Sequence, residues 1–202
     1  MTAHIKPGSV VYDLGANYGI HSLLFARLAK NSGHVYAFEP IPEILTELHA
    51  NVALNYFSNV TCLKLAVTDT TGSAFFARGN HVGAAHLSIG TDDLEGLLSV
   101  ATICLDDFVF KHNHRPPNFI KIDVEGGESR ALTGGERVLN EYRPILLVDL
   151  HSPEQDVAVG QILTQCRYDA YRTVDGSKVE SLAMGWPEPD GLWGQFIAFP
   201  KD

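Results

Sequence analysis

Residues 10–19 combine an acidic side chain with two glycines in a pattern that suits ligand binding. The segment reads Val-Val-Tyr-Asp-Leu-Gly-Ala-Asn-Tyr-Gly, so a β-type run leads through Asp13 into a turn between Gly15 and Gly19. Glycines let the backbone approach a ligand, and free N–H groups at the start of the following helix can face it. Dinucleotide folds usually need GxGxxG to hold a pyrophosphate. The GxxxG spacing therefore favours a cofactor with a polar amino-acid tail, whose ammonium group Asp13 could bind, although a tight structural turn explains Asp-Leu-Gly alone equally well.

A second acidic residue, Glu39, ends the run Ala-Phe-Glu-Pro and lies 20 residues beyond Gly19. A carboxylate at this place can accept hydrogen bonds from both hydroxyls of a ribose. A solvated acid in front of a helix is the alternative. Taken together, the glycine turn and Glu39 favour an adenosyl ligand.

The third group of charged residues lies in the segment Ile-Lys-Ile-Asp-Val-Glu-Gly-Gly-Glu, residues 120–128. Strand alternation places Lys121, Asp123 and Glu125 on one side and the aliphatic residues on the other. Because burial of an unpaired carboxylate is costly, an accidental core position is a poor explanation. An ion pair of Lys121 with an acid at the strand end remains open.

The fourth group is Asp149-Leu150-His151, at the carboxyl end of the next expected strand. Ligands of open α/β sheets bind at the carboxyl ends of strands, so Asp123, Glu125, Asp149 and His151 are expected to converge near a substrate. A single histidine is more often structural than catalytic. Its expected place at the mouth of the site makes the two interpretations of His151 equally strong.

The elements that must position these residues alternate between strands and helices. Short β-branched, aromatic or aliphatic runs predict strands at residues 10–12, 35–38, 60–65, 119–122, 145–150, 168–174 and 193–199. Helical spacing joins the first three, with apolar residues at Ile20, Leu23, Leu24 and Leu28, and then at Ile41, Ile44, Leu45, Leu48 and Val52. This order predicts a Rossmann-like α/β fold with a mostly parallel seven-stranded sheet and a final antiparallel hairpin.

Two segments interrupt the alternation and are expected to be irregular. Residues 69–103 contain five glycines among polar residues, and residues 175–191 contain Pro187 and Pro189. We expect a single domain over residues 1–202, in which 69–103 and the loop around Trp186 cover the acceptor side. Only Met1 to Gly8 precede the first strand. Any cover from the amino end is therefore expected to be missing or to come from another subunit of a homo-oligomer.

Composition excludes several classes of function. The net charge of −9, with no basic run, argues against a nucleic-acid partner. The three cysteines, Cys62, Cys104 and Cys166, are scattered, which favours buried thiols over disulfides or a metal site. No apolar run is long enough for a membrane span, and no signal peptide is evident, so a soluble cytoplasmic protein is expected.

The order of these motifs resembles the FkbM-type methyltransferase family. The resemblance rests on residues 11–19, 35–40, 54–55, 105–107 and 120–128, followed by Leu132 and Gly134. It implies the seven-stranded methyltransferase fold, S-adenosylmethionine as cofactor, and O-methylation of a hydroxyl on a sugar or natural product. It also implies cofactor contacts from the residues around the glycine turn and from the second strand: Asp13, Gly15, Asn17, Gly19 and Glu39. Asp123 and Glu125 are implied to have a role in the site. Asp149 stands where the family often has Glu, which affects that side chain's reach.

The expected reaction is attack of an acceptor hydroxyl on the sulfonium methyl, helped mainly by positioning. Asp123 or His151 would accept the proton, and Glu125 would orient the acceptor or the cofactor's amino group. A divalent ion held by Asp123, Asp149 and His151 is the alternative. A metal-independent reaction is favoured because Lys121 provides an internal counter-charge. A nicotinamide-dependent oxidoreductase and a non-catalytic S-adenosylmethionine-binding module remain as rival functions.

Overall fold

A seven-stranded sheet forms the centre of the protein in this computed structural model, which describes residues 2–78, 85–88, 97–185 and 188–201. In spatial order its strands are β10 (Tyr168–Arg172), β13 (Gln195–Pro200), β9 (Ile145–Asp149), β8 (Phe119–Ile122), β1 (Val10–Leu14), β2 (His34–Phe38) and β3 (Val60–Leu63). The strands from β9 to β3 pair in parallel, and β13 is antiparallel to both β9 and β10. The predicted fold class, with its antiparallel final pair, is confirmed.

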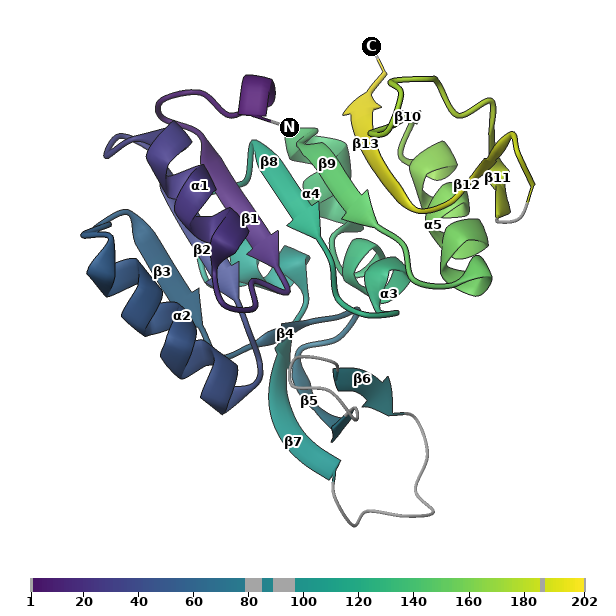
Figure 1. Ribbon diagram of the computed structural model, residues 1–202. Helices are drawn as coiled ribbons and strands as arrows, with labels where there is room; N and C mark the ends of the chain where they lie inside the picture. Colours follow the sequence, from purple (N-terminus) through teal and green to yellow (C-terminus); the bar gives the residue numbers. More distant parts are fainter. Residues whose placement is uncertain (1, 79–84, 89–96, 186–187, 202) are drawn as a thin grey trace.

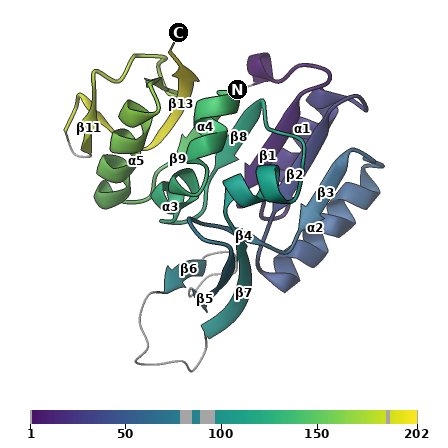
Figure 2. The same ribbon diagram turned by 180° about the vertical axis from the view of Figure 1, so that it is seen from behind.

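Helices cover both faces of this sheet (Figures 1 and 2). One face packs against α1 (Ile20–Ala29) and α2 (Pro42–Leu54). The other packs against η2 (Asp107–Lys111), α3 (Glu128–Thr133), α4 (Glu136–Tyr142) and α5 (Pro153–Gln165). A 3-10 turn, η1 (Thr2–His4), precedes β1. Burial on both faces explains why the central strands are almost continuously apolar in sequence.

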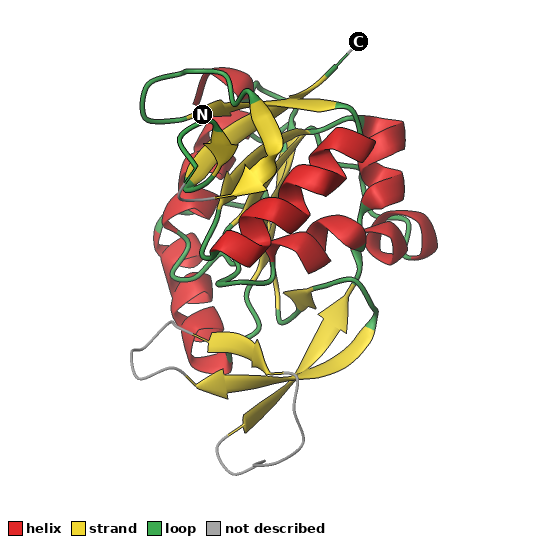
Figure 3. Cartoon of the chain, turned by 90° about the vertical axis from the view of Figure 1, so that its right-hand side faces the viewer, coloured by secondary structure: helices red, strands yellow, loops and turns green. Residues whose placement is uncertain are grey.

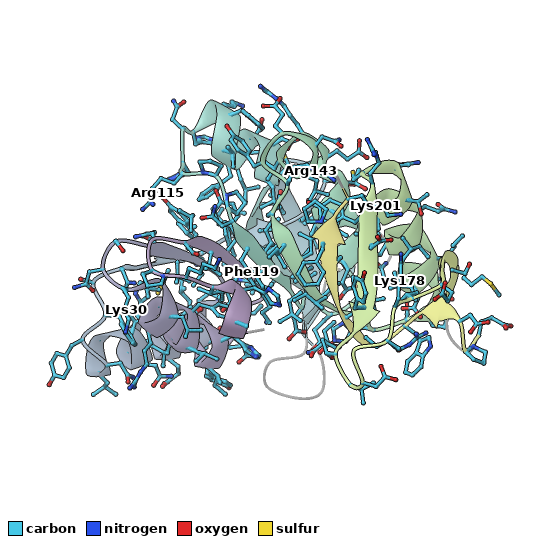
Figure 4. All side chains as sticks on the ribbon, turned by 90° about the horizontal axis from the view of Figure 1, so that it is seen from above. Lys30, Arg115, Phe119, Arg143, Lys178 and Lys201 are labelled. Carbon is cyan, nitrogen blue, oxygen red and sulfur yellow. The ribbon has the colours of Figure 1, made fainter. Side chains whose placement is uncertain are left out.

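Strand alternation divides the core between the two faces. Tyr12 points toward the α3–α5 side, where its ring meets Phe38 and Phe108 edge-on. On the opposite face Phe119 packs against Phe25 of α1, and it lies in the middle of the molecule in Figure 4. The same alternation decides which charged residues of β1 and β8 meet, because side chains in register on one face are neighbours.

The buried face of helix α1 overlaps only in part with its apolar spacing, since Leu23 and Leu28 are partly buried against the core. Phe25, Ala26 and Ala29 are buried, whereas Ile20 is 78% exposed. The residues at 22, 25, 26 and 29 also have helical spacing, and their small or flat side chains fit closely against β1 and β2. Ile20 has the helical spacing of the apolar residues but lies outside the buried face.

A second sheet follows β3, and its strands run in the order β4 (Ala66–Val67), β7 (Leu97–Ile103), β5 (Gly72–Arg78) and β6 (Ala85–Ser88). It lies beyond the carboxyl ends of the parallel strands (Figures 1 and 3). The prediction that 69–103 is irregular is wrong for these strands, because the antiparallel ladder of β5 with β7 satisfies the backbone in spite of the glycines. Residues 79–84 and 89–96, with four of the five glycines, lie outside the described part.

The segment 175–191 is also more regular than its sequence predicts. It contains β11 (Ser181–Gly185) and leads into β12 (Gly191–Leu192), and the two strands pair in parallel beside α5. Gly160 of α5 allows this packing, since a Cβ there would lie 1.5 Å from the carbonyl oxygen of Leu182. At the neighbouring sheet edge, Lys178 and Lys201 each lie 3.1 Å from Asp169 Oδ1 (Figure 4).

All three cysteines are free, but only Cys166 is buried, so the expectation of buried thiols holds for one of them. Cys62, on the edge strand β3, and Cys104, directly after β7, are partly exposed. Among the described residues, no helix has the length and apolar character needed to cross a membrane.

Candidate active site

A cavity of about 370 Å³ opens at the carboxyl ends of β1, β2 and β8. It is lined by the turn after β1 and the start of α1, the end of β2, the segment after β3, and the end of β8 with the loop that follows it. The lining residues are Gly15–Tyr18, Ile20, His21, Phe38–Ile41, Leu65–Val67, Lys121, Asp123–Glu125 and Gly127. The cavity therefore lies where parallel α/β sheets bind their ligands. It includes Gly15, Asn17, Glu39, Asp123 and Glu125 from the residues that the sequence singled out.

The turn after β1 is fixed by close backbone contacts. Gly15 has a φ of +73°, and a Cβ at this position would lie 1.9 Å from the carbonyl oxygen of Asp123. Gly19 has a φ of +90°, and its Cβ would meet Leu48 at 2.4 Å. A side chain at either place would push the turn away from β8 or α2. Gly19 thus shapes the turn from behind, whereas Gly15 faces the cavity.

Glu39 is buried at the cavity wall, and its carboxylate accepts two backbone hydrogen bonds. Oε1 accepts from Ile41 N at 2.9 Å, and Oε2 accepts from Asn17 N at 3.0 Å. Burial raises the pKa of Glu39, and the two N–H donors oppose that rise. Each oxygen keeps a further lone pair for a ligand. The carboxylate therefore connects the β1 turn to the end of β2 and remains able to bind hydroxyl groups.

Asp13 lies behind the turn instead of at the cavity wall. Its carboxylate is fully buried, with Oδ2 accepting a hydrogen bond from Ser22 at 2.6 Å. Oδ1 lies 3.5 Å from Nζ of Lys121, its register partner on β8. Asp13 is not among the cavity-lining residues, because strand alternation directs it toward α1. Asp13 would therefore influence a ligand indirectly, by holding Lys121 and the turn in place.

Lys121 joins three parts of the site. Its buried ammonium donates to the Gly15 carbonyl at 3.2 Å, and it lies 3.2 Å from Asp123 Oδ2 as well as 3.5 Å from Asp13. The predicted placement of Lys121 and Asp123 on one side is thus confirmed. A buried ammonium among three oxygens is compensated, whereas loss of it would leave Asp13 without a counter-charge.

Asp123 and Glu125, which line the cavity after β8, come together with His151, which is not among the lining residues. Nε2 of His151 lies 3.5 Å from Asp123 Oδ1 and 3.7 Å from Glu125 Oε2. The three side chains are 32%, 41% and 28% exposed, so all can meet a substrate from solvent. The predicted convergence of these three residues is confirmed. Asp149 lies apart from this group, with its Oδ2 accepting from Gln195 Nε2 at 3.3 Å.

The residue that sequence reasoning missed is Glu128, at the start of α3. It is fully buried, and its Oε1 lies 2.8 Å from Nδ1 of His151. The hydrogen bond to Glu128 raises the pKa of His151 to about 9; partial burial opposes this, and the charges of Glu128, Glu125 and Asp123 add to it. Glu128 stands at the end of the Gly-Gly-Glu segment, but nothing in the sequence indicated that it would be buried, because an acid in the first turn of a helix normally faces solvent.

The two segments expected to cover the acceptor side are described only in part. Ala66 and Val67 of β4 line the cavity, so the start of the second sheet contributes to the wall. Residues 79–84, residues 89–96 and Trp186 lie outside the described residues. The covering role of these segments stays a prediction.

The sequence profile of the methyltransferase FkbM domain matches residues 13–170, which include every residue that lines the cavity. The chain belongs to the FkbM methyltransferase family. The match confirms the family that the motifs indicate.

Among relatives of this FkbM-family chain is the hexuronic acid methyltransferase AglP of Haloferax volcanii, 26% identical over 158 residues. The alignment covers 78% of this chain and 62% of AglP. The 31-O-demethyl-FK506 methyltransferase FkbM of Streptomyces tacrolimicus is 27% identical, with 84% of this chain and 75% of that protein covered. The 2-O-methyltransferase NoeI of Sinorhizobium fredii is 26% identical, with 78% and 68% covered. The chain thus spans about three-fifths to three-quarters of these proteins.

Solved structures of low sequence identity share the fold. The methyltransferase FkbM from Methylobacillus flagellatus superimposes with a TM-score of 0.63 at 20% identity, over 96% of this chain and 44% of that one. Fibrillarin from Aeropyrum pernix, solved with bound S-adenosyl-L-methionine, gives a TM-score of 0.56 at 11% identity, over 97% and 68%. At these identities the likeness concerns the fold alone.

Proposed function

We propose that this FkbM-family protein is an S-adenosylmethionine-dependent O-methyltransferase that acts on a hydroxyl of a sugar or natural product. The observation that carries the proposal is the cavity at the carboxyl ends of β1, β2 and β8, with Glu39 buried in its wall. Family membership supports the reaction type. The acceptor class follows from the relatives, whose names refer to a hexuronic acid, a demethylated natural product and a 2-O position.

The chemistry of the cavity wall fits an adenosyl cofactor. Glu39 offers acceptor oxygens for ribose hydroxyls, and apolar side chains such as Phe38, Ile41 and Leu65 suit a purine ring. The lysine at the wall, Lys121, is already bound to three oxygens of the protein. A pyrophosphate would find little free positive charge here, which argues against the nicotinamide-dependent alternative.

Asp13, Gly15, Asn17, Gly19 and Glu39 would hold the cofactor in different ways. Glu39 and Asn17 would contact it, Gly15 would let the backbone approach, and Asp13 and Gly19 would keep the turn in place. When bound, S-adenosylmethionine supplies a methyl group on a positively charged sulfur. The residues of the turn contribute by holding that group in a fixed direction, and orientation alone can be worth roughly 7–11 kcal/mol.

Asp123 and Glu125 of the cavity wall, with His151 beside them, form the proposed acceptor end and provide the groups for proton transfer. Asp123 and His151 are the candidates to take up the proton that the acceptor hydroxyl releases, and Glu125 can orient a neighbouring hydroxyl. Since all three are partly exposed, an acceptor from solvent can reach them. The charge pairs among these residues need no metal ion, so the proposed reaction is metal-independent.

Calorimetric titration with S-adenosylmethionine and with NADH separates the two cofactor classes. We expect binding of the first and none of the second. Binding of NADH alone would overturn the proposal. A panel of sugars and phenolic natural products with isotope-labelled cofactor then tests transfer, and cofactor binding without transfer to any acceptor would favour a non-catalytic binding module.

A further inference from the structure

Glu128 is a fully buried carboxylate to which the proposed reaction assigns no step. We propose that Glu128 is a positioning residue that holds His151 as a charged donor facing Asp123 and Glu125, so that Asp123 is the group that takes up the acceptor's proton. The proposal rests on the proposed function for the proton-transfer step alone. The pairing of Glu128 with His151 can be tested without an acceptor.

The position of Glu128 is fixed from several directions. Its Oε1 accepts a hydrogen bond from Gly126 N at 3.0 Å and lies 2.8 Å from Nδ1 of His151. The next residue, Ser129, donates its N–H to Gln155 of α5 at 2.9 Å, which holds the start of α3 against α5. The second oxygen, Oε2, is buried and has no hydrogen-bond partner among the described residues. An ionised carboxylate buried in this way needs a counter-charge, and within the described part of the chain His151 supplies it.

The other edge of the imidazole meets two more carboxylates. If Nδ1 carried the only ring proton and donated it to Glu128, the lone pair of Nε2 would face Asp123 at 3.5 Å and Glu125 at 3.7 Å. That arrangement is repulsive, whereas a doubly protonated ring donates toward acids on both edges. The geometry therefore favours the imidazolium, in agreement with a pKa of about 9 for His151, raised first by the hydrogen bond to Glu128.

The remaining acidic groups near His151 do not compete for this role. Asp149, on the same strand end, accepts from Gln195. From α5, Glu154 is exposed and its pKa is lowered by hydrogen bonds to backbone and Ser152, while Asp156 is buried in the helix. The cation Lys121 reaches Asp123 from the opposite side, through Oδ2. Asp123 thus lies between two positive groups, the ammonium of Lys121 and the imidazolium of His151. Of these two, Glu128 contacts the imidazolium.

Of the two candidates for the proton, a protonated His151 cannot accept it, which leaves Asp123, while Glu125 keeps its role of orienting the acceptor. In the proposed step the acceptor O–H proton passes to a carboxylate oxygen of Asp123. The freed electron pair of the oxygen forms the bond to the methyl carbon, and the sulfur–carbon bond breaks with its pair remaining on sulfur. The products are the methyl ether and the neutral thioether S-adenosylhomocysteine. His151 keeps its proton throughout and stabilises the negative charge of Asp123 and Glu125.

Nuclear magnetic resonance titration of histidine-labelled protein tests the pairing directly. Glu128→Gln keeps the size of the side chain and an acceptor oxygen for Nδ1–H but removes the charge. We expect the pKa of His151 to fall by about one unit or more, a tenfold loss of proton affinity, while the other histidines titrate as before. The matched control is Glu154→Gln, an exposed acid in the first turn of α5, which should leave His151 unchanged. An unchanged His151 in Glu128→Gln overturns the proposal.

The pH profile of methyl transfer tests the functional step. Wild-type transfer should show no ionisation between about pH 6.5 and 8.5 that depends on His151. In Glu128→Gln such an ionisation should enter this range and disappear in the double variant with His151→Gln, while affinity for S-adenosylmethionine is unchanged. A profile that is identical in both proteins contradicts the assignment of Asp123. If the wild type fails to bind S-adenosylmethionine, the proposed function is wrong, yet the histidine titration still decides the role of Glu128.

Discussion

The two ends of the cavity are built in opposite ways. At the proposed cofactor end, formed by the turn after β1 and the end of β2, Glu39 and Asp13 are buried, and their carboxylates accept hydrogen bonds from groups of the protein. At the proposed acceptor end, Asp123 and Glu125 are partly exposed and lie opposite the ring of His151. The cofactor end is therefore fixed by the fold itself, and the acceptor end by interactions between side chains.

This difference suggests where each end can tolerate change. When a buried carboxylate that accepts backbone hydrogen bonds is replaced, the backbone N–H groups lose their acceptor, and no other group can take its place. Partly exposed charges are screened by water, so their replacement should alter the reaction more than the stability. Lys121 belongs to both ends, since it contacts Asp13 and Asp123. Substitutions of Lys121 and of the acids at each end therefore test whether the two ends respond differently.

The largest effect is expected from Lys121→Met. Removal of the ammonium leaves the carboxylate of Asp13 buried without its counter-charge, which should lower the free energy of unfolding by about 3–5 kcal/mol. Urea denaturation measures it. Lys111→Met is the control, because Lys111 is 67% exposed beside Asp107, and its loss should cost under about 1 kcal/mol. Equal costs in the two variants would show that the cofactor end is not fixed by this buried pair.

Glu39→Ala should weaken binding of S-adenosylmethionine while the protein stays folded. Each hydrogen bond from a ribose hydroxyl to the carboxylate should be worth roughly 1.5–3 kcal/mol, or about 10- to 150-fold in affinity. Calorimetric titration measures the affinity, and a thermal melt checks the fold. Glu47→Ala, an exposed acid on α2, should leave both unchanged. Wild-type affinity in Glu39→Ala would remove the ribose assignment.

His151 should make stability depend on pH. Because the pKa of His151 is raised from 6.5 to about 9 in the folded protein, its stabilising effect is complete below about pH 6.5 and is lost as the pH rises to about 9. With screening by solvent, the difference in unfolding free energy between wild type and His151→Gln should shrink by about 1 kcal/mol over this range. Urea melts at several pH values measure it. A difference that grows with pH would mean that the ring is neutral in the folded state.

Features that depend on short segments of the sequence could be predicted, and features that depend on distant residues could not. The turn around Gly15, the place of Glu39 and the alternation of strands and helices depend on short segments, and their spacing was enough to predict them. The pairing of Lys121 with Asp13 depends on strand register between residues 108 positions apart, which no local pattern contains. The inward turn of Glu128 and the antiparallel pairing of β5 with β7 likewise depend on distant partners. Tertiary contacts decided these features against the local signal.

The exposed face of Ile20 illustrates the limit within one helix. Leucines and Ile20 gave a plausible apolar stripe, but the αL turn at Gly19 sets where α1 begins, and the smaller residues Ala26 and Ala29 pack against the sheet. Ile20 instead lies at the mouth of the cavity. An apolar residue left exposed beside a cavity is thus a result of the site's geometry that periodicity alone did not predict.

The smallest expected effect is that of divalent metal. Asp123, Glu125 and His151 offer ligand atoms within 4.8 Å of one another, the kind of group that can hold a metal ion. However, Asp123 already faces the ammonium of Lys121, and His151 would have to lose its proton to bind an ion, which lowers the affinity for the ion near neutral pH.

Added Mg²⁺ or Mn²⁺ should therefore leave the melting temperature unchanged, and methyl transfer should persist in EDTA. The Asp123→Asn variant serves as the comparison, since it should lose transfer with or without metal. If EDTA abolishes wild-type transfer and Mg²⁺ or Mn²⁺ restores it, then Asp123, Glu125 and His151 act as ligands, and the acceptor end is organised by an ion instead of by the imidazolium.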